Sequence, residues 1–363
     1  METDIHKLFL QLVRQGIGHA DVTDIADNVD WVALKALAAR QGLKTVVLDG
    51  LNMVHGEGVM ILDSMPQMMR LEWIGEVLRG ESIYKHQQEV AADMAKMFHH
   101  NAIRTYILKG NAIAECYPKP EHRVSGDIDC FLLPEKGDFN AWERGNELIE
   151  TKGFSVNTDF YKNSVFDISG VNVENHQYLT PFRGNEKLRN LEKFFQCLIR
   201  SDEEDSRFEG TWLYRPPVMV SALFLIEHAY SHFLHEGLTW RMVLDWMLFG
   251  KKHKEDIDWE EFEKRIDEFG FRKFYDSFSR LGRYLIGEFQ DSGFTSQDKR
   301  MLSDIWAALD LHETVRGWKG KVNLAGNTWR ARWKYRYFTD MNWVQALWIQ
   351  VKGFLFEKQP ALD

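Results

Sequence analysis

Cysteine is scarce in this 363-residue sequence. Its three cysteines, Cys116, Cys130 and Cys197, form no C-x-x-C pair, which excludes a disulfide framework and the usual zinc and redox motifs. The first residues, METDIHKLFLQLVRQ, lack the basic segment and the apolar segment of a signal peptide. We therefore expect a protein of the reducing cytoplasm.

Long apolar runs and an excess of positive charge are also absent. The longest strongly apolar run, residues 218–226, is far shorter than the roughly 17–25 residues that cross a bilayer, so no membrane span is expected. Lys and Arg number 45 against 54 Asp and Glu, a formal net charge of −9. This balance disfavours general nucleic-acid binding.

The hydrophobic period divides the chain into three regions, which we predict as 1–100, 101–180 and 181–363. The first and third repeat apolar residues at helical spacing, and the third also holds an acidic loop at 201–210 and a break at 324–328. The middle region alternates strand and helix patterns. Its predicted strands lie at 103–108, 127–133, 164–168 and 171–179, and its predicted helices at 110–117 and 139–154.

Two acids begin one of these apolar strands, in the stretch HRVSGDIDCFLL. Side chains two apart on a strand point to the same face, so Asp127 and Asp129 aim at one spot, and paired carboxylates repel unless a cation lies between them. Carboxylates with open positions for water and phosphate are typical of a Mg²⁺ site. An isolated D-x-D is more often an exposed turn, so the motif needs support from its surroundings.

Two features near these acids give that support. Upstream, the stretch YILKGNA places Lys109 and Gly110 between a strand and a helix, where backbone N–H groups can face phosphate oxygens. Downstream, Asn172, Glu174 and His176 share one face of the strand at 171–179.

Glu174 is one candidate for a third carboxylate in a two-metal site for phosphoryl or nucleotidyl transfer, and Asp167 on the preceding strand is its rival. Lys109 and Arg123 would either stabilise triphosphate charge or form ion pairs with neighbouring acids, Asp127 included.

These elements together resemble the uncharacterised nucleotidyltransferase family of the polymerase-β superfamily, whose members pair an LKG element with R-x-x-x-D-[IV]-D. The resemblance extends to the segments 29–51, 87–110 and 228–246 and covers about residues 25–250. It implies an α+β fold, in which a small mixed-sheet nucleotidyltransferase palm is embedded between N-terminal and C-terminal helical regions.

The resemblance also implies roles for individual residues. The metal ligands and catalytic acids would be Asp127, Asp129 and Glu174, and the nucleotide would contact Lys109, Gly110, Asn111, Arg123, Ser125 and Gly126. The resemblance includes His228, His232, Arg241 and Asp245. Of the helical residues we expect His232, Arg241 and Asp245, together with His176 of the sheet, to face a cleft.

Two patterns in the helical region have competing interpretations. His228, His232 and His235 lie on one helix face and could bind zinc, but H-E-x-x-H is absent. The favoured interpretation is that they line an interdomain cleft or bond to Asp245 and Glu227. Arg241 and Asp245 are spaced to pair with each other. The stretch 329–338 interleaves arginine with aromatic residues, typical of an amphipathic helix and a weak candidate for acceptor binding.

We therefore predict a Mg²⁺-dependent nucleotidyltransferase that moves NMP from an NTP to an acceptor hydroxyl and releases pyrophosphate, with a two-metal site when NTP is bound. The acceptor is left open between a small molecule, a sugar, a protein and tRNA. The superfamily prefers Gly-Gly or Gly-Ser where this chain has Gly110-Asn111, which motivates one alternative: a catalytically inactive nucleotide-binding or regulatory protein that retains the palm.

Overall fold

The computed structural model describes residues 3–19, 29–53, 55–56, 59–60, 64–202, 206–307, 331–356 and 362. The predicted break at 324–328 and residues 203–205 of the predicted acidic loop lie outside these described residues. Within them, no helix is both long enough and apolar enough to cross a bilayer.

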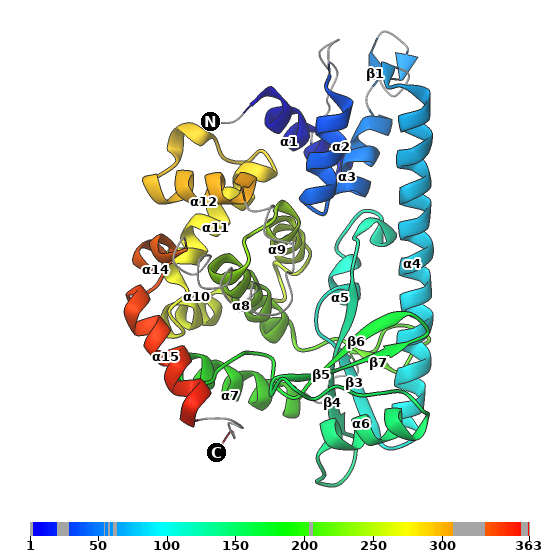
Figure 1. The fold of residues 1–363 in the computed structure, drawn as a ribbon, viewed down its shortest axis with the longest axis vertical. Coiled ribbons are helices and arrows are strands. Elements are labelled where there is room, and N and C mark those ends of the chain that lie inside the picture. The colour runs from blue at the N-terminus through cyan, green and yellow to red at the C-terminus, as the bar shows by residue number, and fades with distance from the viewer. Residues whose placement is uncertain are drawn as a thin grey trace.

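Within the described residues, four helices and a small antiparallel sheet precede the central sheet. The helices are α1 (Asp4–Gly16), α2 (Trp31–Arg40), α3 (Lys44–Met53) and α4 (Gln67–His99), and the small sheet pairs β1 (His55–Gly56) with β2 (Val59–Met60). Figure 1 shows α4 extending from the side of α1–α3 down to the sheet. α1 and α3 cross closely at two glycines, because a Cβ on Gly16 would lie 2.2 Å from the Val46 carbonyl oxygen and one on Gly50 would lie 2.1 Å from that of Leu12.

The central sheet has five strands in the order β5-β6-β4-β3-β7. They are β3 (Ile103–Ile107), β4 (Asp127–Pro134), β5 (Asn163–Ile168), β6 (Val171–His176) and β7 (Leu213–Tyr214). β4 runs parallel to β6 and antiparallel to β3, and β7 runs parallel to β3. The sheet is therefore mixed. The turn between β5 and β6 has positive φ at both Ser169 and Gly170, as expected for a tight hairpin.

The two faces of the sheet pack against different helices. Ile128, Cys130 and Leu132 of β4 face α4 and α6 (Ala141–Thr151), together with Val173 of β6. Phe131 of the same strand points to the opposite face and joins the larger core of the helical regions. The strand period of two thus places Asp127 and Asp129 on the face turned toward the C-terminal helices.

The remaining helices surround that second face. They are the one-turn α5 (Asn111–Ala114), α7 (Glu186–Arg200), α8 (Val218–His235), α9 (Trp240–Lys252), α10 (Trp259–Glu268), α11 (Arg272–Leu285), α12 (Ser296–Ala307), α14 (Arg332–Phe338) and α15 (Trp343–Phe356), with 3₁₀ turns at Pro120–His122 and Asp291–Gly293. In Figure 1, α8 and α9 lie between the sheet and the outer helices α10–α15.

The described part of the basic and aromatic stretch forms α14, which packs as an amphipathic helix. Tyr335 and Phe338 are buried in the core, and Lys334 donates to the Phe233 carbonyl and pairs with Asp304 at 2.7 Å. This packing agrees with the amphipathic interpretation.

The predicted α+β class is confirmed, with a mixed sheet between helical regions. The strand and helix patterns missed two features. β7 is only two residues long, too short for a period, and lies in a stretch that we expected to be all helical. α4 begins some twenty residues earlier than its pattern, because Leu71 and Leu78 on its first half are exposed and no single apolar face marks it. The region boundaries at 100 and 180 stay a prediction.

Because α1 and α3 cross closely, one methyl group added at the crossing should destabilise the fold. Gly50→Ala should lower the free energy of unfolding by about 2–3 kcal/mol, because the new Cβ meets rigid backbone. Gly75→Ala is the matched control: it lies within α4 in open space and should raise stability by up to about 1 kcal/mol. Urea unfolding measures both, and equal effects of the two substitutions would contradict the close crossing.

Candidate functional site

Parallel pairing of β4 with β6 brings the predicted acids together. Asp129 lies directly opposite Glu174, and Asp127 opposite Asn172. His176 is two residues beyond Glu174 on the same face, and its Nε2 donates to Asp129 Oδ1 at 3.0 Å and lies 3.4 Å from Glu174 Oε2. The pairing that the sequence interpretation required is therefore present.

Asp129 is 1% exposed, which makes the compensation of its charge the main electrostatic problem of the site. Burial by itself would raise the pKa of Asp129, but the Lys109 ammonium, 3.2 Å from Oδ1, and the hydrogen bond from His176 hold it well below its usual range. Oδ2 is buried and has no hydrogen-bond partner among the described residues. One oxygen of this carboxylate is thus compensated and the other is available to a ligand.

The neighbouring carboxylates differ in their electrostatics. Burial and repulsion from Asp129 raise the pKa of Asp127, whereas the hydrogen bond from His176 lowers that of Glu174. Ligand atoms of Asp129, Glu174 and His176 all lie within 4.8 Å of one another, the spacing of a metal site. Asp127 is on the same sheet face but is not part of that close group. Like charges this close favour a bound cation.

The structure separates the two candidates for the third carboxylate. Asp167 is exposed on β5, opposite Asn172, and its Oδ1 accepts the N–H of Gly170 in the hairpin turn. Glu174 instead lies beside Asp129. The geometry favours Glu174, because Asp167 already stabilises a turn.

The Lys109-Gly110-Asn111 turn carries several unpaired polar atoms. Gly110 has φ +61°, and a Cβ there would lie 2.7 Å from Ser125 Oγ and 3.6 Å from Arg123 Nη1. That Nη1 is buried without a hydrogen-bond partner in the described chain, and the same is true of Nδ2 and Oδ1 of Asn111. Unsatisfied buried groups are costly, so donors at a glycine turn indicate a place for an oxygen-rich ligand.

Arg123 pairs with Asp245 and not with Asp127. Its Nε and Nη2 donate to the two carboxylate oxygens of Asp245 at 3.1 and 2.8 Å, and the Tyr117 hydroxyl donates to Oδ1 at 2.7 Å. Asp245 is therefore the partner of Arg123 and not of Arg241. Arg241 donates to the Val124 carbonyl at 2.8 Å. Both contacts fasten the loop before β4 to α9.

A second cluster fastens the same loop to the N-terminal helices. His122 pairs with Asp49 of α3 at 2.5 Å and with Glu81 of α4 at 2.8 Å, and Lys119 also pairs with Asp49. Burial would lower the pKa of His122, but these two carboxylates raise it. In addition, Gln87 of α4 donates to the Ser125 carbonyl at 3.2 Å.

The histidine stripe of α8 does not form a metal group among the described residues. The ring centroids of His228 and His232 are 4.4 Å apart, and His232 Nδ1 lies 2.9 Å from Glu236 Oε2. Burial and the nearby Lys109 hold the pKa of His228 well below its usual range, so this ring lies close to the acid-bearing face. The expected roles of His232 and Arg241 stay a prediction.

The sequence patterns give no role in the site to three nearby groups, Glu192, Glu227 and Lys162. Glu227 is expected only as a partner of the α8 histidines, but among the described residues His232 pairs with Glu236 instead. Burial raises the pKa of both Glu192 and Glu227 to about 7, and lowers that of Lys162. Glu192 accepts the N–H groups of Leu179 and Thr180. Glu227 lies in the apolar run LFLIEHAY, and an acid in such a run is itself a signal. No pattern marks Lys162.

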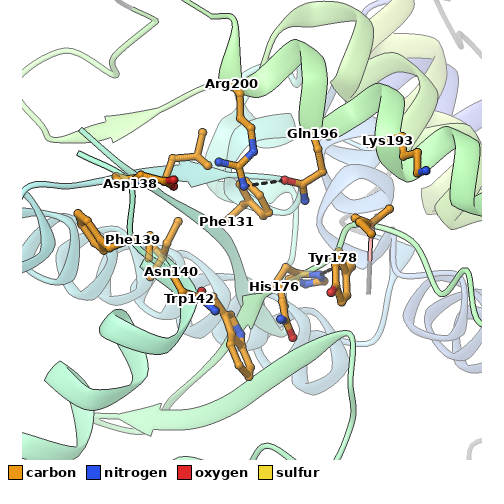
Figure 2. A pocket seen from close by; sticks show the side chains of 16 residues that line it. Phe131, Asp138, Phe139, Asn140, Trp142, His176, Tyr178, Lys193, Gln196 and Arg200 are labelled. Carbon is orange, nitrogen blue, oxygen red and sulfur yellow. Dashed lines mark hydrogen bonds between the residues drawn. The ribbon is translucent and has the colours of Figure 1, made fainter. Parts of the chain in front are cut away.

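A hollow of about 600 Å³ adjoins the site at the far end of the same strands. Figure 2 shows His176 and Tyr178 on one side of it and Gln196 and Arg200 of α7 on another, with Trp142 below. His176 is fully buried and separates this hollow from Asp129. The His176 ring is thus in contact with both the hollow and Asp129.

Comparison with known families agrees with this geometry. The model of an uncharacterised nucleotidyltransferase family matches residues 27–287, which include the acid-bearing strands and α8–α11. The chain belongs to this family. No curated protein and no solved structure matches the chain.

In this member of the nucleotidyltransferase family, breaking the Arg123–Asp245 pair should strongly lower the free energy of unfolding. Asp245→Ala should cost about 3–5 kcal/mol, because it leaves a buried guanidinium without its counter-charge. Asp267→Ala removes an equally close pair with Arg272 at the surface and should cost at most about 1 kcal/mol. Chemical denaturation measures the difference, and similar costs would contradict a buried, structural pair.

The buried glutamates predict the pH dependence of stability. In the folded chain Glu192 and Glu227 keep their protons up to a pKa of about 7, whereas the unfolded chain releases them near 4.5. The folded state then binds more protons in this window, so the free energy of unfolding should fall as pH rises from about 5 to about 8. Glu192→Gln, which imitates the protonated form, should reduce this fall by about 1–3 kcal/mol in urea titrations across the window. An unchanged slope would show that Glu192 ionises normally.

Proposed function

We propose that this protein is a Mg²⁺-dependent nucleotidyltransferase that moves a nucleoside monophosphate from an NTP to an acceptor hydroxyl and releases pyrophosphate. Membership of a nucleotidyltransferase family supports the reaction class. The observation that carries the proposal is Asp129: a buried carboxylate with one oxygen unpaired, directly beside Glu174. A cytoplasmic location is part of the proposal.

The donor set fits a hard divalent cation. Asp129 and Glu174 offer carboxylate oxygens within 4.8 Å, and Asp127 offers another on the same strand face. Oxygen ligands of this type, with remaining positions for water and phosphate, are those that Mg²⁺ prefers. When bound, Mg²⁺ would neutralise charge on the phosphates and orient them. We propose Asp127, Asp129 and Glu174 as its ligands and His176 as the residue that orients two of them.

The triphosphate would lie at the Gly110 turn. Arg123 Nη1 and Asn111 Nδ2 are buried donors without partners in the described chain. Gly110 leaves room beside them, since a Cβ there would lie 3.6 Å from Arg123 Nη1. Arg123 is held rigidly by Asp245, so its free nitrogen needs no reorganisation to bind an oxygen. Ser125 and Gly126 form the facing loop, and Lys109 supplies positive charge next to Asp129.

At the α-phosphorus, the transfer forms one P–O bond and breaks another. The acceptor oxygen bonds to the α-phosphorus, the bond from that phosphorus to the bridging oxygen breaks, and its electrons leave on pyrophosphate. The hydroxyl proton goes to a carboxylate, for which Glu174 is our candidate, since it is less buried than Asp129. Lys109 and Arg123 would stabilise the charge that develops on the leaving group.

Replacing one acid should abolish the reaction without unfolding the chain. Asp129→Asn keeps the shape but removes the charge next to Glu174, so Mg²⁺-dependent pyrophosphate release from NTP should fall by about 100-fold or more. The chain should still fold, because Asp127 and Glu174 continue to offset the Lys109 charge. Pyrophosphate release is followed with a coupled assay, in the presence of a pool of candidate acceptors.

Asp167→Asn is the matched control, since Asp167 lies on the neighbouring strand but bonds only to the hairpin turn, and its activity should stay near wild type. Turnover by Asp129→Asn equal to wild type would refute the assignment. NTP binding that needs Mg²⁺, without pyrophosphate release from any acceptor, would favour the alternative of an inactive nucleotide-binding protein.

A further inference from the structure

A separate cavity of about 320 Å³ lies between α8, the segment before β5, the start of α7 and the C-terminal helices α14 and α15. Its walls are mostly apolar and aromatic, with Phe160, Tyr161, Tyr230 and Leu234 among them. Tyr161 is fixed in place because the Arg183 guanidinium stacks on its ring at 4.2 Å and the Arg183 N–H donates to its hydroxyl. The cavity is therefore shaped by ordered side chains.

One buried carboxylate opens into this cavity. Glu227 of α8 is 2% exposed, lines the cavity, and accepts no hydrogen bond from any residue that the structure describes. Glu192, the other deeply buried glutamate, differs in this respect, since its two oxygens accept from Leu179, Thr180 and Gln196. A buried carboxylate without a donor is costly, and a ligand that supplies a donor would remove that cost.

Glu227 also connects the cavity with the acid cluster. Its strongest electrostatic neighbour is Lys162, which follows Tyr161 in the chain, and Lys109 and His176 also act on it. Those last two residues are the partners of Asp129. The Lys162 ammonium itself makes no ion pair within the described residues, so Glu227 and Lys162 attract each other without direct contact. The backbone connects the two places: the Lys162 carbonyl accepts the N–H of Gln177, which follows His176, and the His176 ring donates to Asp129.

We infer that this cavity receives the acceptor, and that the acceptor is a compact alcohol with an apolar or aromatic body. Its hydroxyl donates to ionised Glu227 while the molecule is bound, and gives its proton to Glu174 when the transfer takes place. This inference rests on the proposed function and specifies its acceptor. The volume excludes a nucleic-acid chain, and the apolar walls disfavour a free sugar, which would leave its hydroxyls unpaired. Above its pKa of about 7, Glu227 is ionised and would repel a carboxylate on the acceptor.

Two probes of the same size test the charge preference on the wild-type chain. Phenethyl alcohol and phenylacetate share a phenyl ring that suits the walls formed by Tyr161 and Tyr230, and differ in the polar end. Ligand-observed NMR titrations at about pH 8.5, where Glu227 with its pKa of about 7 is ionised, should show the alcohol binding at least about tenfold more tightly than the carboxylate. Equal affinities, or no binding of the alcohol, would overturn the inference.

Substitutions locate the binding. Glu227→Gln should weaken the alcohol about tenfold and reduce the preference over phenylacetate, because the negative charge is gone while Lys162 remains. Glu192→Gln is the matched control, equally buried but outside the cavity, and should leave both affinities unchanged. Should Glu227→Gln unfold, Ser231→Phe fills the same cavity one turn further along α8 and should abolish binding of both probes. Unchanged alcohol binding in either folded variant would overturn the inference.

Failure of this inference is distinguishable from failure of the proposed function. Asp129 does not line the cavity, so Asp129→Asn should bind phenethyl alcohol as the wild type does while losing pyrophosphate release. If pyrophosphate release depends on Asp129 but the probes do not discriminate, the transferase stands and this acceptor class is wrong. If the probes bind as expected in a chain that turns over no NTP, the cavity stands without the reaction.

Discussion

The buried carboxylate of Asp129 is the constraint on which the site depends. A charge at 1% exposure is tolerated only with close compensation, and Lys109 and His176 supply it to one oxygen. Each comes from a different neighbour of β4: Lys109 follows β3, and His176 ends β6. The order of strands around β4 is thus also an electrostatic arrangement, in which the central strand carries the acid and the flanking strands carry its counter-charges.

The loop before β4 has to be held from several sides, because it places Arg123 and Ser125 against the Gly110 turn. Asp245 of α9 holds Arg123, the pair of Asp49 and Glu81 holds His122, and Gln87 of α4 holds the Ser125 carbonyl. The helical regions on both sides of the sheet therefore act on the same few residues. The helical regions therefore hold this loop in position, which the sheet alone would not do.

The acid-bearing face also explains why several charged groups outside the motifs have displaced pKa values. Lys162 directly precedes β5, and Glu227 and His228 lie on α8. Burial and the charge of Lys109 act on all three. Each displaced pKa follows from burial first and from these mutual charges second. A cation or a phosphate bound at the acids would change the balance for all of them.

The sequence by itself determined the local features. The period of two in DIDCFLL and VNVENH put the acids on one face of each strand, Ser169-Gly170 specified the hairpin, and Lys109-Gly110 the turn after β3, because these depend on residues close together in the chain. Only the tertiary structure decided that β6 pairs with β4 so that Glu174 and not Asp167 adjoins Asp129, that Arg123 takes Asp245 from a helix 122 residues away, and that Glu227 opens into a cavity. Pairing and burial between distant segments are set by the packing of the whole chain, and no local pattern records them.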